Sequence, residues 1–170
     1  MDEKKVSDLQ DELFKQQNFE VTDLQDEIRV DELCGRLLRF FRQSLIDEDR
    51  LTPAEAGALA HGADYFLREF VIPDRRENIF ALRPGRVRQF AATWYIIRNL
   101  EPNLAELTDI LAGIVAFYHY ARRIGKVKDD LLHQVEEECR DLAYYSRRIE
   151  SFWDIQGDGY FAWEQECSLK

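Results

Sequence analysis

The sequence is poor in the residues that mark turn-rich or cross-linked folds. Its 170 residues include eight glycines and four prolines, too few for the many tight turns of a β-sandwich or β-barrel. The three cysteines, Cys34, Cys139 and Cys167, lie far apart and form no Cys-x-x-Cys pair. An odd number of scattered cysteines indicates a reducing compartment and not a disulfide framework, so we expect a cytoplasmic protein.

Long hydrophobic runs are also missing. The first residues are polar and of mixed charge, without the apolar segment of a secretory signal. The longest apolar stretch, residues 110–120, is followed by Arg122 and Arg123 and is much shorter than the roughly 18 residues that cross a bilayer. We therefore expect no association with a membrane.

An excess of basic residues is the third absence. The chain holds 23 Lys and Arg against 33 Asp and Glu, a net charge of −10, whereas a general nucleic-acid or lipid binder would be basic. Residues 1–32 carry 11 acids and 4 bases, residues 33–127 carry 11 and 14, and residues 128–170 carry 11 and 5. A mildly basic middle therefore lies between two acidic ends.

What the sequence has in quantity is helical periodicity. Apolar residues recur every three or four positions in five segments, and no strand-like alternation interrupts them. The segments run from residue 22 or 30 to 46, and over about 52–72, 86–100, 103–124 and 128–153. The pattern predicts an all-α fold, a single-domain helical bundle of about five to six helices. The expected parts are an acidic N-terminal arm or short helices at 1–28, the bundle at 29–153 and an aromatic C-terminal tail at 154–170.

The arm contains a repeat. Residues 6–13, VSDLQDEL, recur fifteen positions later as residues 21–28, VTDLQDEI. Each copy has the spacing of a capping box, in which Ser7 or Thr22 caps a helix and the glutamine three residues on reaches back. One interpretation is therefore two helix starts built from the same residues. The other is a tandem acidic ligand for a basic groove on a partner.

The tail resembles the calcium-binding loop of EF-hand proteins over twelve residues, 154–165. The residues that match positions one, five, six and eight of that loop are Asp154, Asp158, Gly159 and Phe161. The ligands that the resemblance implies are Asp154, Gln156, Asp158 and Tyr160. Gln165 stands at position twelve, where the family has a bidentate glutamate, so the resemblance implies weak calcium binding. The alternative is a turn that folds the aromatic residues of the tail onto the bundle.

Arginine is unusually frequent, with 17 arginines against 6 lysines. Five of them lie within fourteen residues, around the irregular connection between two expected helices: Arg75, Arg76, Arg83, Arg86 and Arg88. Arginine recognises carboxylates and phosphates through bidentate hydrogen bonds. The cluster is therefore a candidate site for an anionic partner such as nucleic acid. The alternative, favoured by the net charge of −10, is pairing with the protein's own acids.

Catalytic motifs are not found. The sequence has no phosphate-binding loop, nucleophile elbow or dinucleotide fingerprint, and we expect no cofactor. His61 and His119 are candidates for a catalytic base, but neither has a nucleophile nearby in the sequence. An enzyme is therefore the least favoured of three classes.

The favoured class is a non-enzymatic protein–protein interaction or adaptor module. Its partner is another protein or a second copy, with the acidic arm of one copy covering the basic middle of another. The alternatives are nucleic-acid binding through the segment from Arg75 to Arg88 and weak calcium binding through residues 154–165.

Overall fold

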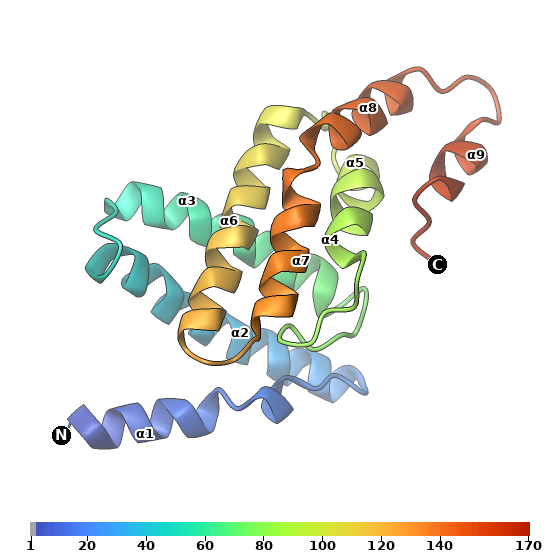
Figure 1. Cartoon of the computed structure of the whole chain (residues 1–170). Helices are drawn as coiled ribbons and strands as arrows, with labels where there is room; N and C mark the ends of the chain where they lie inside the picture. Colours follow the sequence, from blue (N-terminus) through green and yellow to red (C-terminus); the bar gives the residue numbers. More distant parts are fainter. Residues whose placement is uncertain (1–2) are drawn as a thin grey trace.

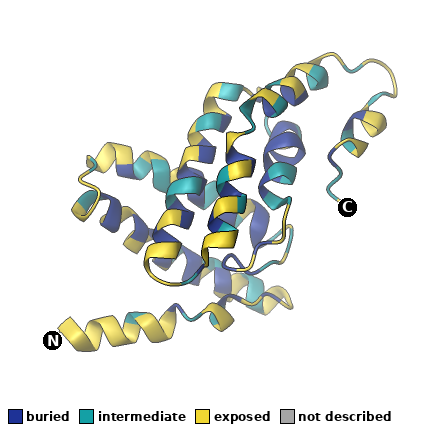
Figure 2. Ribbon diagram, in the orientation of Figure 1, coloured by how far each residue is buried: buried dark blue, intermediate teal, exposed yellow. Residues whose placement is uncertain are grey.

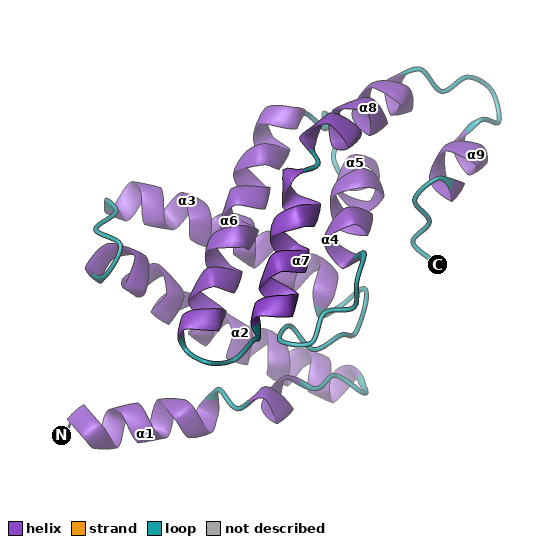
Figure 3. Cartoon of the chain, in the orientation of Figure 1, coloured by secondary structure: helices purple, strands orange, loops and turns teal. Residues whose placement is uncertain are grey.

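The protein is all-helical, and the predicted fold class is confirmed. The computed structural model describes residues 3–170, and within that range the chain forms helices and loops without a strand (Figures 1 and 3). The helices pack into one compact body.

The described range contains eight continuous helices, more than the five or six expected. They are α1 (Glu3–Leu13), α2 (Leu24–Asp47), α3 (Pro53–Asp64) continued by the π-helix η2 (Tyr65–Val71), α4 (Arg86–Gln89) continued by the π-helix η3 (Phe90–Trp94) and α5 (Tyr95–Arg98), α6 (Leu104–Arg123), α7 (Asp129–Arg140), α8 (Leu142–Trp153) and α9 (Tyr160–Gln165). A 3₁₀ turn, η1 (Gln16–Phe19), follows α1. The larger number arises because the arm and the tail each form a helix and because the segment 128–153 is two helices.

The break between α7 and α8 lies at Asp141, where the backbone leaves the helical region with ψ of 49°. Contacts from α4 hold this break. Arg88 donates its backbone N–H to the Glu138 carboxylate at 3.0 Å and its guanidinium to Asp141 at 3.1 Å. These partners are about fifty residues apart in the chain, so the local apolar pattern, which continues through Asp141, does not indicate the break.

The caps predicted for the repeat are wrong in both copies. Ser7 lies inside α1 and therefore caps nothing. The N-cap of α2 is Asp23, whose carboxylate accepts the N–H of Asp26 at 2.8 Å, while the Asp26 carboxylate accepts the N–H of Thr22 at 3.1 Å. Aspartate caps as well as threonine, and this register gives both reciprocal bonds to carboxylates. Residues 24–28, assigned to the arm from the sequence, are thus the first turn of α2.

Two helices widen into π-helical turns where they meet. The segments η2 and η3 carry Phe66, Phe70, Phe90 and Trp94, whose rings contact one another with centroid separations of 5.1 to 5.8 Å. All four side chains are buried. The apolar periodicity predicts a helix in both segments. The wider π-helical turn accompanies packing of rings from distant segments, so no pattern of neighbouring residues indicates it.

Helices α3 and α6 share the most extensive contact between helices in the described part of the chain. A Cβ atom placed on Gly113 would lie 2.3 Å from the carbonyl oxygen of Leu59, and one on Gly62 would lie 2.8 Å from the carbonyl oxygen of Ile110. Glycine at both positions therefore permits direct backbone contact between the helices. A hollow lies on each side of the crossing.

The chain directly after α1 is held to the body by buried side chains, which α1 itself lacks. Phe14, Phe19 and Val21 are buried. The ring of Phe14 contacts Phe40 with a centroid separation of 5.6 Å, and Phe19 contacts Phe80 at 4.7 Å. Helix α1 has no buried residue and is exposed along nearly its whole length (Figure 2).

The tail is held against α8 and η3 by Arg148, which is only 1% exposed. Its guanidinium donates to the carbonyl oxygens of Ala92 at 3.0 Å and Trp163 at 2.7 Å and to the Thr93 hydroxyl at 3.0 Å, and it stacks over the Trp163 ring at 3.8 Å. Thr93 in turn donates to the carbonyl of Cys167 at 2.7 Å. A single buried cation therefore joins three segments of the chain.

Candidate functional site

A mostly apolar groove of about 550 Å³ lies along α6, on one side of its crossing with α3. Its lining residues are Leu59 from α3, Thr108, Leu111, Ala112, Val115 and Ala116 from α6, Glu136, Cys139 and Arg140 from α7, and Leu142 from α8. Because α6 contributes alanine at positions 112 and 116, the space between the larger side chains of α3 and α8 stays unfilled. The break at Asp141 brings Leu142 to the end of this groove.

The charged groups of the groove lie on α7. Glu136 pairs with His119 at 2.7 Å and with Arg140 at a longer 3.8 Å. The side chain of Arg140 is 75% exposed. Burial and nearby carboxylates raise the pKa of the Cys139 thiol, which is therefore a poor nucleophile. The groove can thus pack apolar side chains and pair Arg140 with an acid, but it brings no base and nucleophile together.

A second hollow of about 530 Å³ lies on the other side of the crossing and is more polar. Its lining residues are Ala58, His61, Gly62, Tyr65, Asn99, Glu106, Asp109 and Ile110. The Asn99 amide donates to the Tyr65 hydroxyl at 3.1 Å, and the Tyr95 hydroxyl donates to Glu106 at 3.0 Å. Burial raises the pKa of Tyr95 to about 12, so both this hydroxyl and that of Tyr65, whose pKa burial also raises, are neutral at physiological pH.

The two candidate catalytic histidines are placed differently. His61 is exposed at the second hollow, beside Tyr65 and Asn99. His119 is exposed and bound to Glu136, while its neighbour Tyr118 is buried and donates to the carbonyl of Ile79 at 2.7 Å. His119 and Tyr118 therefore face different surroundings and form no common site.

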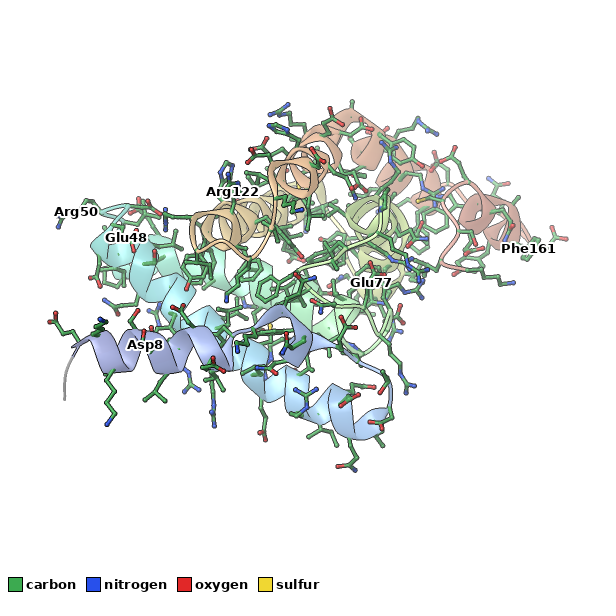
Figure 4. All side chains as sticks on the ribbon, turned by 60° about the horizontal axis from the view of Figure 1, so that its bottom comes forward. Asp8, Glu48, Arg50, Glu77, Arg122 and Phe161 are labelled. Carbon is green, nitrogen blue, oxygen red and sulfur yellow. The ribbon has the colours of Figure 1, made fainter. Side chains whose placement is uncertain are left out.

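Four of the five clustered arginines pair with the chain's own carboxylates. The pairs are Arg75 with Asp74 (2.7 Å), Arg76 with Glu27 (3.5 Å), Arg86 with Glu77 (2.6 Å) and Arg88 with Asp141 (3.1 Å). Arg83 is exposed, and its backbone N–H donates to the Glu77 carboxylate. Figure 4 shows Glu77 in the midst of the packed side chains of the body. The structure thus brings the cluster together mainly as a structural junction.

Three of these arginines also connect parts of the chain that are distant in sequence. Arg76 reaches α2, Arg88 reaches α7 and α8, and Arg75 donates to the carbonyl of Leu169 in the tail. Their charges and hydrogen-bond donors are therefore largely occupied before any anionic ligand arrives.

The loop after α8 departs from the EF-hand pattern. Asp154, Gln156, Asp158 and Tyr160 are all exposed. The positive φ of 58° falls at Gly157, whereas Gly159, which stands where the EF-hand turn needs its glycine, has φ of −68°. Tyr160 begins α9, so its carbonyl oxygen points along the helix and not into the loop.

The aromatic residues of the tail do not share one environment. Trp163 is buried under Arg148, as the alternative to a calcium loop predicted. Tyr160 and Phe161 are exposed, and Figure 4 shows Phe161 at the outer edge of the molecule.

We expect Ca²⁺ to cause no saturable change in the fluorescence of Trp153 and Trp163 up to about 1 mM, the weak end of natural calcium loops. The reason is that the candidate oxygens are not arranged around one point. Magnesium is the control. A saturable change with Ca²⁺ alone that Asp154→Asn removes would contradict this expectation and support the EF-hand resemblance.

The comparisons with known proteins add no assignment. No family model matches the chain, and no curated protein or solved structure is detectably similar to it. Among residues 3–170, no three His, Cys, Asp or Glu side chains are grouped as a metal site. None of the helices described is both long and apolar enough to cross a bilayer.

Sequence reasoning missed the groove and Arg148. The alanines on α6 fit a core-facing helix equally well, so no sequence signal separates the groove from the core. The sequence does indicate a structural role for Arg148, because this residue lies between Tyr145 and Ile149 on the apolar face of α8. A charged side chain buried there needs hydrogen-bond partners.

Proposed function

We propose that this protein is a non-enzymatic interaction module that binds an amphipathic helix of a partner protein in the groove along α6. The observation that carries the proposal is the open apolar groove on an otherwise strongly acidic molecule. Apolar hollows of this size on a protein surface are typical binding sites, and a helix offers side chains at the spacing that fills them.

The charges around the groove support the same partner. Arg140 is exposed at the rim and only weakly paired, so it can bind a carboxylate beside the apolar face of the incoming helix. The pairing of the arginine cluster favours this proposal over nucleic-acid binding, because an anion would have to displace Asp74, Glu27, Glu77 and Asp141.

The test is a groove-blocking substitution, Ala112→Arg, because Ala112 is an exposed residue within the groove. The tagged protein and the variant are compared in capture from an extract, followed by binding of the recovered protein in purified form. We expect a partner that binds the unmodified chain and loses at least tenfold in affinity with the variant, because a buried unpaired charge costs more than 1.4 kcal/mol.

Ala58→Arg is the matched control, since Ala58 is exposed and lines the other hollow. It should bind like the unmodified chain. If no recovered protein distinguishes Ala112→Arg from Ala58→Arg, the groove is not the binding site and the proposal fails.

A further inference from the structure

The repeat in residues 6–13 and 21–28 is not explained by helix capping, because its two copies lie differently in the fold. The first copy lies inside α1, and the second crosses the start of α2. Both copies nevertheless expose the same apolar pair, one helical turn apart. Leu9 and Leu13 are 59% and 38% exposed, and Leu24 and Ile28 are 58% and 53% exposed. A single exposed leucine is ordinary, but a repeated pair points to a contact surface.

The two copies differ in burial, because the first buries no residue and the second buries Val21. In the second copy, Glu27 pairs with Arg76 at 3.5 Å, and the next turn of α2 buries Val30. Helix α1 buries no residue, and its apolar residues Val6, Leu9 and Leu13 form one stripe at the spacing i, i+3, i+7. The three side chains are 36%, 59% and 38% exposed, and Leu13 also lines a small hollow beside Leu33 of α2.

The groove is out of reach for α1 of the same chain. Phe14 and Phe19 fix the chain directly after α1. Figure 1 shows α1 beyond the end of α6 that precedes α7, whereas the groove residues of α6, from Thr108 to Ala116, lie toward its opposite end. While both phenylalanines stay buried, only a second copy can place its α1 in this groove.

Helix α1 matches the groove in length and in charge. Val6 to Leu13 spans about 10 Å along the helix axis, and Thr108 to Ala116 spans about 12 Å. Helix α1 carries four carboxylates against two lysines. Glu12 flanks the apolar stripe of α1 and is therefore placed to pair with Arg140 at the rim of the groove.

We propose that the protein forms a reciprocal dimer in which α1 of each copy lies in the groove of the other, with Val6, Leu9 and Leu13 against α6. This inference rests on the proposed function and names a second copy of the chain as the partner. Exchange of the same helix in both directions closes as a two-fold dimer and leaves neither groove nor stripe unpaired.

The repeat supplies a matched pair of variants for the test. Leu9→Lys with Leu13→Lys charges the first copy, in α1 (the first-copy variant), and Leu24→Lys with Ile28→Lys makes the same change in the second copy, in α2 (the second-copy variant). Light scattering coupled to size-exclusion chromatography measures the mass. We expect twice the 20.1 kDa mass of one chain for the unmodified protein and for the second-copy variant, and the mass of a single chain for the first-copy variant. Circular dichroism checks that both variants stay folded.

Mixing two monomeric variants tests the geometry. The first-copy variant keeps an intact groove, and Ala112→Arg keeps an intact α1. An equal mixture should therefore form a heterodimer, although neither variant dimerises alone. A monomeric unmodified protein at its highest soluble concentration would overturn the inference. So would equal effects of the two lysine pairs, or no heterodimer in the mixture.

The two proposals fail separately. If the purified chain is a monomer and yet captures another protein through a contact that Ala112→Arg removes, the groove binds a helix but not that of a second copy. If the chain is a monomer and Ala112→Arg changes no capture, both proposals are overturned.

Discussion

Gly113→Ala should lower the free energy of unfolding by about 3 kcal/mol, the upper part of the range for overpacked cores. The added Cβ would lie 2.3 Å from the carbonyl oxygen of Leu59. The Cβ is rigidly attached to the backbone of α6 and the oxygen belongs to the backbone of α3, so neither can move without separating the two helices. The better helix propensity of alanine offsets only about 1 kcal/mol of this cost. Urea unfolding followed by circular dichroism measures the change, which corresponds to roughly 10 °C in the melting temperature of a chain this size.

Gly57→Ala is the control for this substitution. Gly57 also lies within a helix, α3, but its nearest neighbour for an added Cβ is the flexible guanidinium end of Arg42 at 3.6 Å, an ordinary contact. In Gly57→Ala only the better helix propensity of alanine acts, and we expect the free energy of unfolding to rise by up to about 1 kcal/mol. If both alanine variants stabilise the protein, the close approach of α3 and α6 does not exist in solution. The groove, which this crossing shapes, would then also be in doubt.

Arg148→Met should release the tail and lower the free energy of unfolding by about 3 kcal/mol. The substitution leaves the carbonyls of Ala92 and Trp163 and the hydroxyl of Thr93 without their charged donor in a buried site. It also removes the cation from the Trp163 ring. We expect a red shift of tryptophan emission as Trp163 meets water, together with faster proteolysis after α8.

Arg147→Met is the control, because it removes the exposed arginine next to the buried Arg148. The Arg147 side chain is 58% exposed and pairs with Glu166 at 3.0 Å, a contact that also involves Arg148 at 3.3 Å. An exposed pair of this kind contributes at most about 1 kcal/mol, so this variant should keep its emission spectrum and its resistance to protease. A tail that stays protected in Arg148→Met would show that apolar packing of Trp163 suffices to dock it.

Gly113→Ala and Arg148→Met each change a contact between segments that are distant in the sequence. Contacts of this kind are the parts of the fold that the sequence did not predict. The five apolar periodicities gave the long helices because the hydrophobic pattern of one helix is local information. The break at Asp141 escaped this reasoning, since it depends on Arg88, which comes from α4. The π-helical turns of η2 and η3 likewise accompany ring contacts between distant segments, of Phe66 and Phe70 with Phe90.

The candidate sites show the same division. The arginine cluster was found from its spacing, but its pairing with Asp74, Glu27, Glu77 and Asp141 required the fold. The groove could not be predicted from the sequence, because alanines on an apolar helix have the same pattern whether a neighbouring helix covers them or not.

The sequence by itself determined the helical class, the places of the long helices, the acidic ends and the repeat, because each of these is a property of neighbouring residues. Only the tertiary structure decided which charges are neutralised, where α6 is left uncovered and that one copy of the repeat buries no residue. All three features depend on which helix surfaces pack against each other. The contact of α3 with α6 at Gly62 and Gly113, for example, depends on how all the helices of the bundle pack together. The physical reason is that helix formation follows local periodicity, whereas burial and pairing follow from contacts between distant segments.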